Sequence, residues 1–412
     1  MKVLILSQYF WPESFRINEV AESLRIAGCE VCVLTGQPNY PDGKVFPGYR
    51  ALSTGRELYA DCDVYRVPLF PRGRGGTLRM VLNYSSFVFG AAVLGPWLLR
   101  GRRFDIIFVY GVSPILQALP GVLLRRLTGG ALVPWVQDLW PQSLVVTGFV
   151  RKRWLLSAVD AIVRWIYRRS DLLLVQSRGF VPVVSSMAGK TPVEYHPNPG
   201  DLPILQTSDE PTDLVLNPGF NVVFAGNMGT VQALGTVLDA AEMLRGEIDV
   251  RFVLIGSGSR SDWVYQQVRR RRLHNVQLAG RLPPQAMPKI FSQASALLVT
   301  LVSSPIMSQT VPTKIQAYLA AGKPIVASLD GEGARIVNSA GAGVTCPPED
   351  STALAEVVRR LRLCSVNERE QMGKNGRSYY ERHFEPSMLA RRLCDRFAEL
   401  VVVRGREGSG SA

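Results

Sequence analysis

Residues 2–36, KVLILSQYFWPESFRINEVAESLRIAGCEVCVLTG, decide the fold. Two short apolar runs, KVLILS and EVCVLTG, enclose a helical stretch, FRINEVAESLRIAG, which Gly28 ends as a C-terminal cap. A strand, a helix and a second strand in this order form the βαβ unit of a parallel sheet. The same alternation continues almost throughout the chain. The sequence therefore predicts an α/β protein with parallel sheets and helices on both of their faces.

The strand-like runs form two series, separated by a segment rich in Pro and Asp. The first series is KVLILS, EVCVLTG, DIIFVYG, LVPWVQ and DLLLVQS, and the second is NVVFAG, VRFVLIG, VQLAG, ALLVTLV, PIVASL and GVTC. We expect two doubly wound Rossmann-like domains facing a cleft, because such sheets bind ligands beyond the carboxyl ends of their strands. The expected parts are a first domain over residues 1–200, a linker over 201–219 and a second domain over 220–385. After them we expect a helix over 386–404 that crosses back to the first domain, and a disordered tail over 405–412.

The composition is that of a basic globular protein. Of the 412 residues, 47% are hydrophobic and 20% charged, which excludes a disordered or fibrous chain. The formal net charge of +13 attracts anions, but no nucleic-acid-binding module is recognisable. We therefore expect an anionic membrane surface, and not nucleic acid, as the partner. Six cysteines are too few for a disulfide framework, and with only three histidines we expect no metal site.

One apolar segment is long enough to concern a membrane. Residues 80–99, MVLNYSSFVFGAAVLGPWLL, are uncharged and lie between Arg79 and Arg100. Their length permits a span, but polar residues and a proline lower the hydrophobicity, and a lone span would separate one repeat from its sheet. A buried core helix and monotopic insertion are the two leading alternatives. The initial KVLILS run is too short for a secretory signal and is interpreted as a buried strand.

The sharpest motif is VPTKIQAYLAAGKPIVAS, residues 311–328. Thr313 can cap a helix that starts at Lys314, Gly322 ends it, and Pro324 opens the next strand. A phosphate at the helix start would meet free backbone N–H groups, the helix dipole and the lysine ammonium together. The alternative is an ordinary helix–strand unit with a solvated lysine.

A second motif, VVFAGNMGTVQAL over residues 222–234, is a strand that runs into a glycine-containing turn and a helix. Gly226 and Gly229 let the backbone approach a ligand closely, and Asn227 and Gln232 carry amide donors. The later turn IGSGS lacks the third glycine of a dinucleotide site. The first strand of the chain is followed by no glycine at all, which argues against a dehydrogenase.

Several stretches together resemble a known family. FAGNMGTVQAL, LAGRLPPQAMPKIFSQASALLV and VPTKIQAYLAAGKPIVAS resemble the donor-binding domain of glycosyltransferase family 4. SQYFWPESFRINEVAESLRIAG, LTGQPNYPDGKVFPGYR and WVQDLWPQS are similar to its bacterial O-antigen and colanic-acid branch. The resemblance covers about residues 1 to 400. It implies the GT-B fold, with a nucleoside-diphosphate sugar in the second domain and the acceptor at the first.

The resemblance assigns roles to the motif residues. Lys314 would stabilise the charge left on the diphosphate, without a metal or other cofactor. Arg281 would flank the nucleobase, and Arg16 would offer a cation to the diphosphate, although a solvated arginine is the alternative for both. Most members retain the anomeric configuration without an established protein nucleophile. The full expected donor set is Arg16, Gly226, Asn227, Gly229, Gln232, Arg281, Thr313, Lys314 and Glu332.

The chain departs from the family pattern at several of these positions. Many relatives have Arg and Lys where Asn227 and Gln232 stand, so more of the positive charge rests on the lysine of the 311–328 motif. The paired glutamates of the family correspond to Gln309 and Ala317. Because the second glutamate usually holds the donor ribose, Glu332 in DGEGAR is offered as a replacement.

Acceptor-side candidates follow the strands of the first domain. Asp138 comes after LVPWVQ, where a carboxylate can orient or deprotonate an acceptor hydroxyl, and the alternative is a turn aspartate. Gln137 takes the place of the family's cleft histidine. Ser113 and Pro114 are expected to cap and open the helix after DIIFVYG.

The family branch generally works on sugars carried by polyprenyl diphosphate, which stays in the membrane. An enzyme with a hydrophobic face on residues 80–99 and basic residues around it would meet that acceptor at the inner leaflet. The expected headgroup and acceptor cations are Arg72, Arg74, Arg79, Arg100, Arg102 and Arg103.

These inferences combine into one functional expectation. The protein would be a peripheral or monotopic enzyme at the cytoplasmic face of the inner membrane. It would transfer a hexose or N-acetylhexosamine, specifically an N-acetylated or deoxy hexose, from a UDP-sugar, and the anomeric configuration would be retained. The acceptor would be a polyprenyl-diphosphate-linked precursor of surface polysaccharide such as O-antigen or lipopolysaccharide. The alternatives are a non-catalytic nucleotide-sugar-binding scaffold of the same fold and a nucleotide-dependent oxidoreductase.

Overall fold

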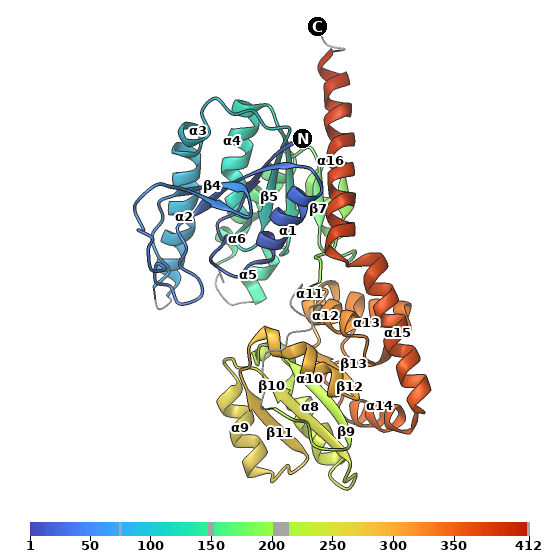
Figure 1. The fold of residues 1–412 in the computed structure, drawn as a ribbon. Coiled ribbons are helices and arrows are strands. Elements are labelled where there is room, and N and C mark those ends of the chain that lie inside the picture. The colour runs from blue at the N-terminus through green and yellow to red at the C-terminus, as the bar shows by residue number, and fades with distance from the viewer. Residues whose placement is uncertain (74–75, 147–151, 201–213, 410–412) are drawn as a thin grey trace. The chain divides into compact units, whose positions relative to one another are not determined.

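The computed structural model describes residues 1–73, 76–146, 152–200 and 214–409, and it divides into two compact units (Figure 1). The first unit comprises Met1–Pro197 and Pro386–Ala412, and the second comprises Asn198–Glu385. The C-terminal helix α16, Pro386–Ser409, thus belongs to the first unit. Because α16 continues through residue 409, the prediction of a disordered tail from residue 405 is wrong for 405–409. Residues 410–412 and most of the expected linker, 201–213, lie outside the described residues.

An eight-stranded sheet forms the centre of the first unit, in the order β3-β4-β2-β1-β5-β6-β7-β8. The strands are β1 Lys2–Leu6, β2 Glu30–Gly36, β3 Gly55–Tyr59, β4 Cys62–Val67, β5 Ile106–Gly111, β6 Ala131–Val136, β7 Leu173–Val175 and β8 Val193–Tyr195. All neighbours pair in parallel except β3 and β4, which form an antiparallel hairpin. The apolar runs predicted as parallel strands are confirmed, and they are buried because helices cover both faces.

Helices cover the two faces of this sheet with separate core layers. Helices α1, Arg16–Ile26, and α16 pack on one face, where their apolar side chains join those of β1, β2 and β5. The other face carries α2 Thr77–Val93, α3 Gly95–Leu98, the 3₁₀ turn η1 Ile115–Ala118, α4 Leu119–Thr128, α6 Arg153–Tyr167 and α7 Phe180–Ala188. A short helix, α5 Gln142–Val146, precedes the undescribed residues 147–151.

Helix α16 is held on the first unit by apolar and ionic contacts. The Phe397 ring meets Phe108 of β5 edge to face, with their centroids 5.5 Å apart. Arg396 binds both carboxylate oxygens of Glu194 on β8, at 2.6 to 3.0 Å. The prediction that the C-terminal helix packs with the first domain therefore agrees with the division of the structure.

The apolar segment 80–99 is not one continuous helix. Helix α2 ends at Val93, Leu94 follows, and α3 then covers Gly95–Leu98. One side of α2 is buried through Asn83 and Phe87, whereas Phe89 is 70% exposed. Among the described residues, no helix is both long enough and apolar enough to cross a membrane. The segment therefore combines a core-packed side with an exposed apolar side.

The second unit has a six-stranded parallel sheet in the order β11-β10-β9-β12-β13-β14. Its strands are β9 Phe220–Ala225, β10 Val250–Ile255, β11 Val276–Gly280, β12 Ala296–Thr300, β13 Ile325–Ser328 and β14 Gly343–Cys346, each one predicted from the sequence. One face is covered by α8 Leu234–Met243, α9 Ser261–Arg270 and α14 Ser351–Leu363. The other face is covered by α10 Met287–Gln293, α12 Thr313–Ala321, α13 Gly331–Ala340 and α15 Val366–His383, with the short α11 Pro305–Gln309 beside α13.

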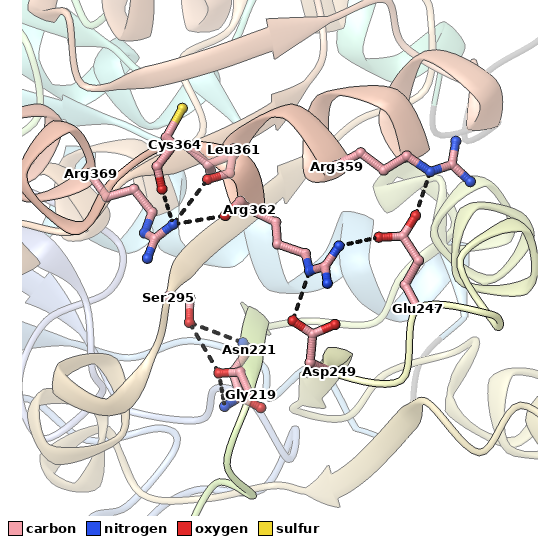
Figure 2. Close-up of polar contacts among 10 residues, drawn as sticks. All are labelled: Gly219, Asn221, Glu247, Asp249, Ser295, Arg359, Leu361, Arg362, Cys364 and Arg369. Atoms are coloured by element: carbon pink, nitrogen blue, oxygen red, sulfur yellow. Dashed lines mark hydrogen bonds and ion pairs between the residues drawn. The ribbon is translucent and has the colours of Figure 1, made fainter.

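An arginine network ties α14 to the sheet (Figure 2). Arg362 donates to Asp249 at 2.7 Å and to Glu247 at 2.9 Å, and Arg359 donates to Glu247 at 2.6 Å. The hydrogen bond from Arg362 lowers the pKa of the Asp249 carboxyl group. Arg369 of α15 donates to three carbonyl oxygens at the end of α14, which would otherwise lack partners. The contacts of Arg359 and Arg362 hold the turn that precedes β10, and those of Arg369 hold the end of α14.

Candidate functional site

The site of the second unit lies where its sheet changes direction. From β9 the chain first adds β10 and β11 on one side, and then returns to add β12, β13 and β14 on the other side. Neighbouring loops at the carboxyl ends of β9 and β12 therefore leave in opposite directions, and open α/β sheets bind ligands at such switch points. The turn after β9 and the start of α12 meet there, because Lys314 contacts Phe224 and Gly226.

Lys314 places an ammonium group at this edge. Its Nζ lies 3.6 Å from the centroid of the Phe224 ring, a cation–π contact. A side chain at Gly226 would collide with the lysine, because a Cβ there would lie 2.6 Å from Lys314 Cε. Burial lowers the pKa of Lys314 to about 7. Within the described parts of the chain it forms no ion pair, so its charge is balanced by no carboxylate.

Tyr318, one turn further along α12, holds the end of β9. Its hydroxyl accepts from the Ala225 N–H at 3.1 Å and donates to the Ala225 carbonyl at 3.3 Å. The Tyr318 ring is fully buried and meets Phe291 edge to face. Because Lys314 and Tyr318 are four residues apart, they lie on one side of the helix. Tyr318 therefore fixes the strand end against the helix that carries the lysine.

The turn after β9 packs closely against the neighbouring loop, and the predicted approach of its glycines to a ligand stays a prediction. Gly226 has a φ of +134°, in a region that L side chains rarely adopt. Gly256 of the next loop touches it, since a Cβ there would lie 1.8 Å from the Gly226 carbonyl oxygen. Gln232 accepts from the Gly229 N–H at 3.2 Å, so its amide oxygen stabilises the turn itself. Asn227 is exposed.

A pocket of about 320 Å³ opens beside this turn, at the start of α8. Its lining includes Gly229, Thr230, Arg260 and Glu349. The Arg260 guanidinium stacks on the Trp263 ring at 4.0 Å. Arg260 and Glu349 were not predicted as site residues. Arg260 could have been proposed from the sequence, because it directly follows the glycine-containing turn IGSGS.

Three other predicted donor residues are now placed. Thr313 is the first residue of α12 and Pro312 occupies the N-cap, so the prediction that Thr313 caps the helix is wrong. Gly322 ends α12 with a φ of +65°, as predicted. Glu332, the candidate for ribose binding, pairs with Arg335 at 2.7 Å on α13. Arg281 is exposed after β11.

In the first unit, Asp138 is held by a neighbouring loop. Its Oδ2 accepts from the backbone N–H of Ser113 at 3.2 Å and from the Ser113 hydroxyl at 2.7 Å, and Trp140 Nε1 donates to that hydroxyl at 3.0 Å. Pro114 has extended backbone angles and precedes the turn η1, so the prediction that Ser113 caps a helix opened by Pro114 is wrong. Gln137 is buried, and its N–H donates to the Gly111 carbonyl at 3.1 Å.

A buried carboxyl group at the same sheet edge was not predicted from the sequence. Glu13 accepts hydrogen bonds from the backbone N–H groups of Asn39 and Tyr40, each at 2.7 Å. Burial nevertheless raises the pKa of Glu13 to about 7. The buried Arg66 donates to the carbonyl oxygens of Gly36 and Trp11. These two side chains join the loops that follow β1 and β2.

The predicted basic residues of the first unit differ in their surroundings. Arg102 forms an ion pair with Asp63 at 2.8 Å, which corrects the expectation that it is a free headgroup cation. Arg72 stacks on the Tyr40 ring at 5.3 Å. The exposed members are Arg79, Arg100 and Arg103, while Arg16 is half-buried at the start of α1 and Arg74 lies outside the described residues.

Both units match glycosyltransferase families. Residues 14–199 match the family described as glycosyl transferase 4-like domain, and residues 219–362 match glycosyl transferases group 1. The chain belongs to the group 1, family 4-like glycosyltransferases. It is 27% identical over 387 residues to the putative colanic acid biosynthesis glycosyl transferase WcaI of Escherichia coli, covering 88% of this chain and 92% of that protein. It is 25% identical to the probable glycosyltransferase WbjE of Pseudomonas aeruginosa, covering 73% and 76% of the two chains.

Solved structures of glycosyltransferases share the fold. Sucrose-phosphate synthase from Thermosynechococcus elongatus superimposes with a TM-score of 0.72 at 16% identity, covering 98% of this chain and 99% of that one. Anabaena HepE, solved in complex with UDP, gives 0.68 at 14% identity, covering 97% and 100%. The glycosyltransferase fold of two Rossmann-like domains, predicted from the sequence, is thus confirmed. This glycosyltransferase contains no group of three potential metal ligands within its described residues, and a metal-free reaction stays a prediction.

Proposed function

We propose that this glycosyltransferase moves an N-acetylated or deoxy hexose from a UDP-sugar, with retention, to a polyprenyl-diphosphate-linked acceptor of surface polysaccharide, at the cytoplasmic face of the inner membrane. The unpaired, buried ammonium of Lys314 at the switch point of the second sheet carries the donor part of this proposal. The acceptor part rests on the exposed apolar side of α2 and on the polysaccharide relatives.

The donor chemistry follows from the surroundings of Lys314. Breaking the bond between sugar and phosphate leaves negative charge on the nucleoside diphosphate, and a fixed cation in a water-poor site stabilises it. The ammonium lies beside the backbone of Gly226 and in the first turn of α12, whose N–H groups also favour an anion. HepE, which shares the fold, was solved with UDP, and this supports a uridine nucleotide as the leaving group.

The acceptor chemistry would be served by the first unit. Asp138 uses Oδ2 to hold Ser113, while its Oδ1 forms no hydrogen bond in the described part of the chain. This oxygen can orient an acceptor hydroxyl. The exposed Phe89 and Trp97, with Arg79, Arg100 and Arg103 around them, would bring the enzyme to an acceptor that stays in an anionic membrane.

A thermal-shift comparison of UDP, GDP and NADH tests the donor site. A ligand at 100 times its dissociation constant stabilises the folded state by about 2.7 kcal/mol. We expect a shift selective for UDP that Lys314→Ala removes. Lys323→Ala is the matched control, because Lys323 lies just beyond the other end of α12 and donates to the Ser292 carbonyl. A shift with NADH alone would overturn the transferase proposal, and UDP binding without sugar transfer would favour a scaffold.

A further inference from the structure

Helix α6 exposes large apolar side chains to solvent in the described part of the chain. Trp154 is 66% exposed, Trp165 is 43% exposed and Ile162 is 38% exposed. The opposite side of the helix is buried in the core through Val163 and Ile166. Large apolar side chains gathered on the exposed side of one helix are typical of interaction sites.

The charges around this exposed side are almost all positive. Lys152, Arg153, Arg168 and Arg169 are exposed at the two ends of α6. The guanidinium of Arg169 lies over the Trp165 ring at 4.6 Å. The helix contains one acidic residue, Asp160, and it is paired with Arg164 at 2.6 Å. The surface therefore offers tryptophan and unbalanced cations together.

Helix α6 lies on the same face of the sheet as α2 and α4. Their inward side chains share one core layer, which includes Phe87 of α2, Val122 of α4 and Val163 of α6. Their outer sides therefore all point away from that face. Phe89 of α2 and Leu127 of α4 are 70% and 58% exposed there. All three helices thus expose large apolar side chains on this face of the sheet.

We infer that α6 is a second membrane-binding helix, with Trp154 and Trp165 as interfacial anchors in an anionic lipid surface. Tryptophan favours the membrane interface because its ring is apolar while its N–H remains near water. Lys and Arg at the helix ends attract the anionic headgroups. This inference deepens the membrane part of the proposed function and rests on it. An acidic protein would also meet cations, but tryptophans beside the cations and apolar side chains exposed on three helices of one sheet face fit a lipid surface better.

Vesicle co-sedimentation tests the inference on the full chain. The vesicles contain phosphatidylcholine with or without phosphatidylglycerol, at low and high salt. We expect Trp154→Ser with Trp165→Ser to weaken binding to the anionic vesicles about tenfold or more, because each ring leaves a largely apolar environment. The matched control is Ile26→Ser, since Ile26 is 68% exposed on α1, on the opposite face of the sheet. An unchanged UDP thermal shift shows that each variant is folded.

A second variant separates this inference from the proposed function. Phe89→Ser removes an anchor of α2 and leaves α6 intact. If Phe89→Ser weakens vesicle binding while the double tryptophan variant binds normally, the inference about α6 is overturned and the proposed function stands. If neither variant, nor the wild type at high salt, loses binding, the inference about α6 and the membrane contacts assigned to α2 and the arginines are overturned, whereas the donor part of the proposed function is not affected. Binding equally strong to neutral vesicles would also contradict the electrostatic part of the inference.

Discussion

Raising the pH should weaken donor binding through Lys314. In the free protein, burial lowers the pKa of this lysine to about 7. A diphosphate beside the ammonium would return that pKa toward about 10.4, the ordinary value for lysine. Above pH 7 the free lysine is mostly neutral, so the protein must take up a proton when the donor binds. The dissociation constant therefore rises with pH.

The size of the effect follows from the two pKa values. Between pH 6.5 and 8.5 the dissociation constant should rise about 25-fold, or about 1.9 kcal/mol. At pH 8 only about one free molecule in ten carries the proton, so binding should take up about 0.9 proton. The opposite sign applies to folding, which releases this proton: because the unfolded chain holds it up to about pH 10, Lys314 makes the free protein more stable as the pH rises above 7.

Isothermal titration calorimetry with an intact UDP-sugar measures both quantities. The sugar esterifies the terminal phosphate, which in UDP itself would titrate near pH 6 and confuse the profile. Buffers with different ionisation enthalpies report the proton uptake. Lys314→Met should bind weakly at every pH without this slope, and Lys323→Ala should keep it. A dissociation constant that changes less than about twofold, with no buffer dependence, would refute the reasoning.

Three further changes have expected outcomes. Tyr318→Phe removes the hydroxyl that pairs with Ala225, so the free energy of unfolding should fall by about 1–3 kcal/mol in urea titrations, and UDP affinity should fall with it. Glu13 has a pKa of about 7 in the folded state, so between about pH 4.5 and 7 its carboxyl group is protonated in the folded state and ionised in the unfolded state. The free energy of unfolding should therefore fall as the pH rises through that range. In urea titrations at several pH values, Glu13→Gln should reduce this pH dependence. Arg396→Ala breaks the partly exposed pair with Glu194, so stability should drop by about 1 kcal/mol or less and limited proteolysis should cut α16 sooner.

The sequence was most informative about the strands. Parallel strands buried on both faces are continuous apolar runs, so eleven of the fourteen strands in the described residues could be predicted, whereas β3, β4 and the short, half-buried β8 were not. The β3–β4 hairpin was missed because its turn uses Ala60 and Asp61 at positive φ, with no glycine to mark it. We predicted that α12 begins at Lys314, but it begins one residue earlier, at Thr313. Pro312 does not mark this boundary in the sequence, because proline also occurs at the end of an extended segment that precedes a helix.

The site residues that were missed act through contacts between distant segments. Tyr318 reaches Ala225 across 93 positions, and Glu13 reaches Asn39 across 26. No local pattern records such pairs. The sequence placed Lys314 at the start of a helix because of the local motif around it. Its cation–π contact with Phe224 could not be predicted, because that contact depends on how α12 packs on the sheet. The exposed tryptophans of α6 likewise became evident only when the buried side of that helix was known.

Sugar transfer itself is the most direct test of the account. A panel of radiolabelled UDP-sugars would be incubated with the enzyme and with polyprenyl-diphosphate-linked acceptors in anionic vesicles, and the lipid fraction would be counted. We predict label in the lipid from at least one UDP-linked N-acetylated or deoxy hexose, a product with the same anomeric configuration as its donor, and loss of this label in Lys314→Ala but not in Lys323→Ala. Undiminished transfer by Lys314→Ala, or no transfer from any UDP-sugar by a wild type that binds UDP, would contradict the account.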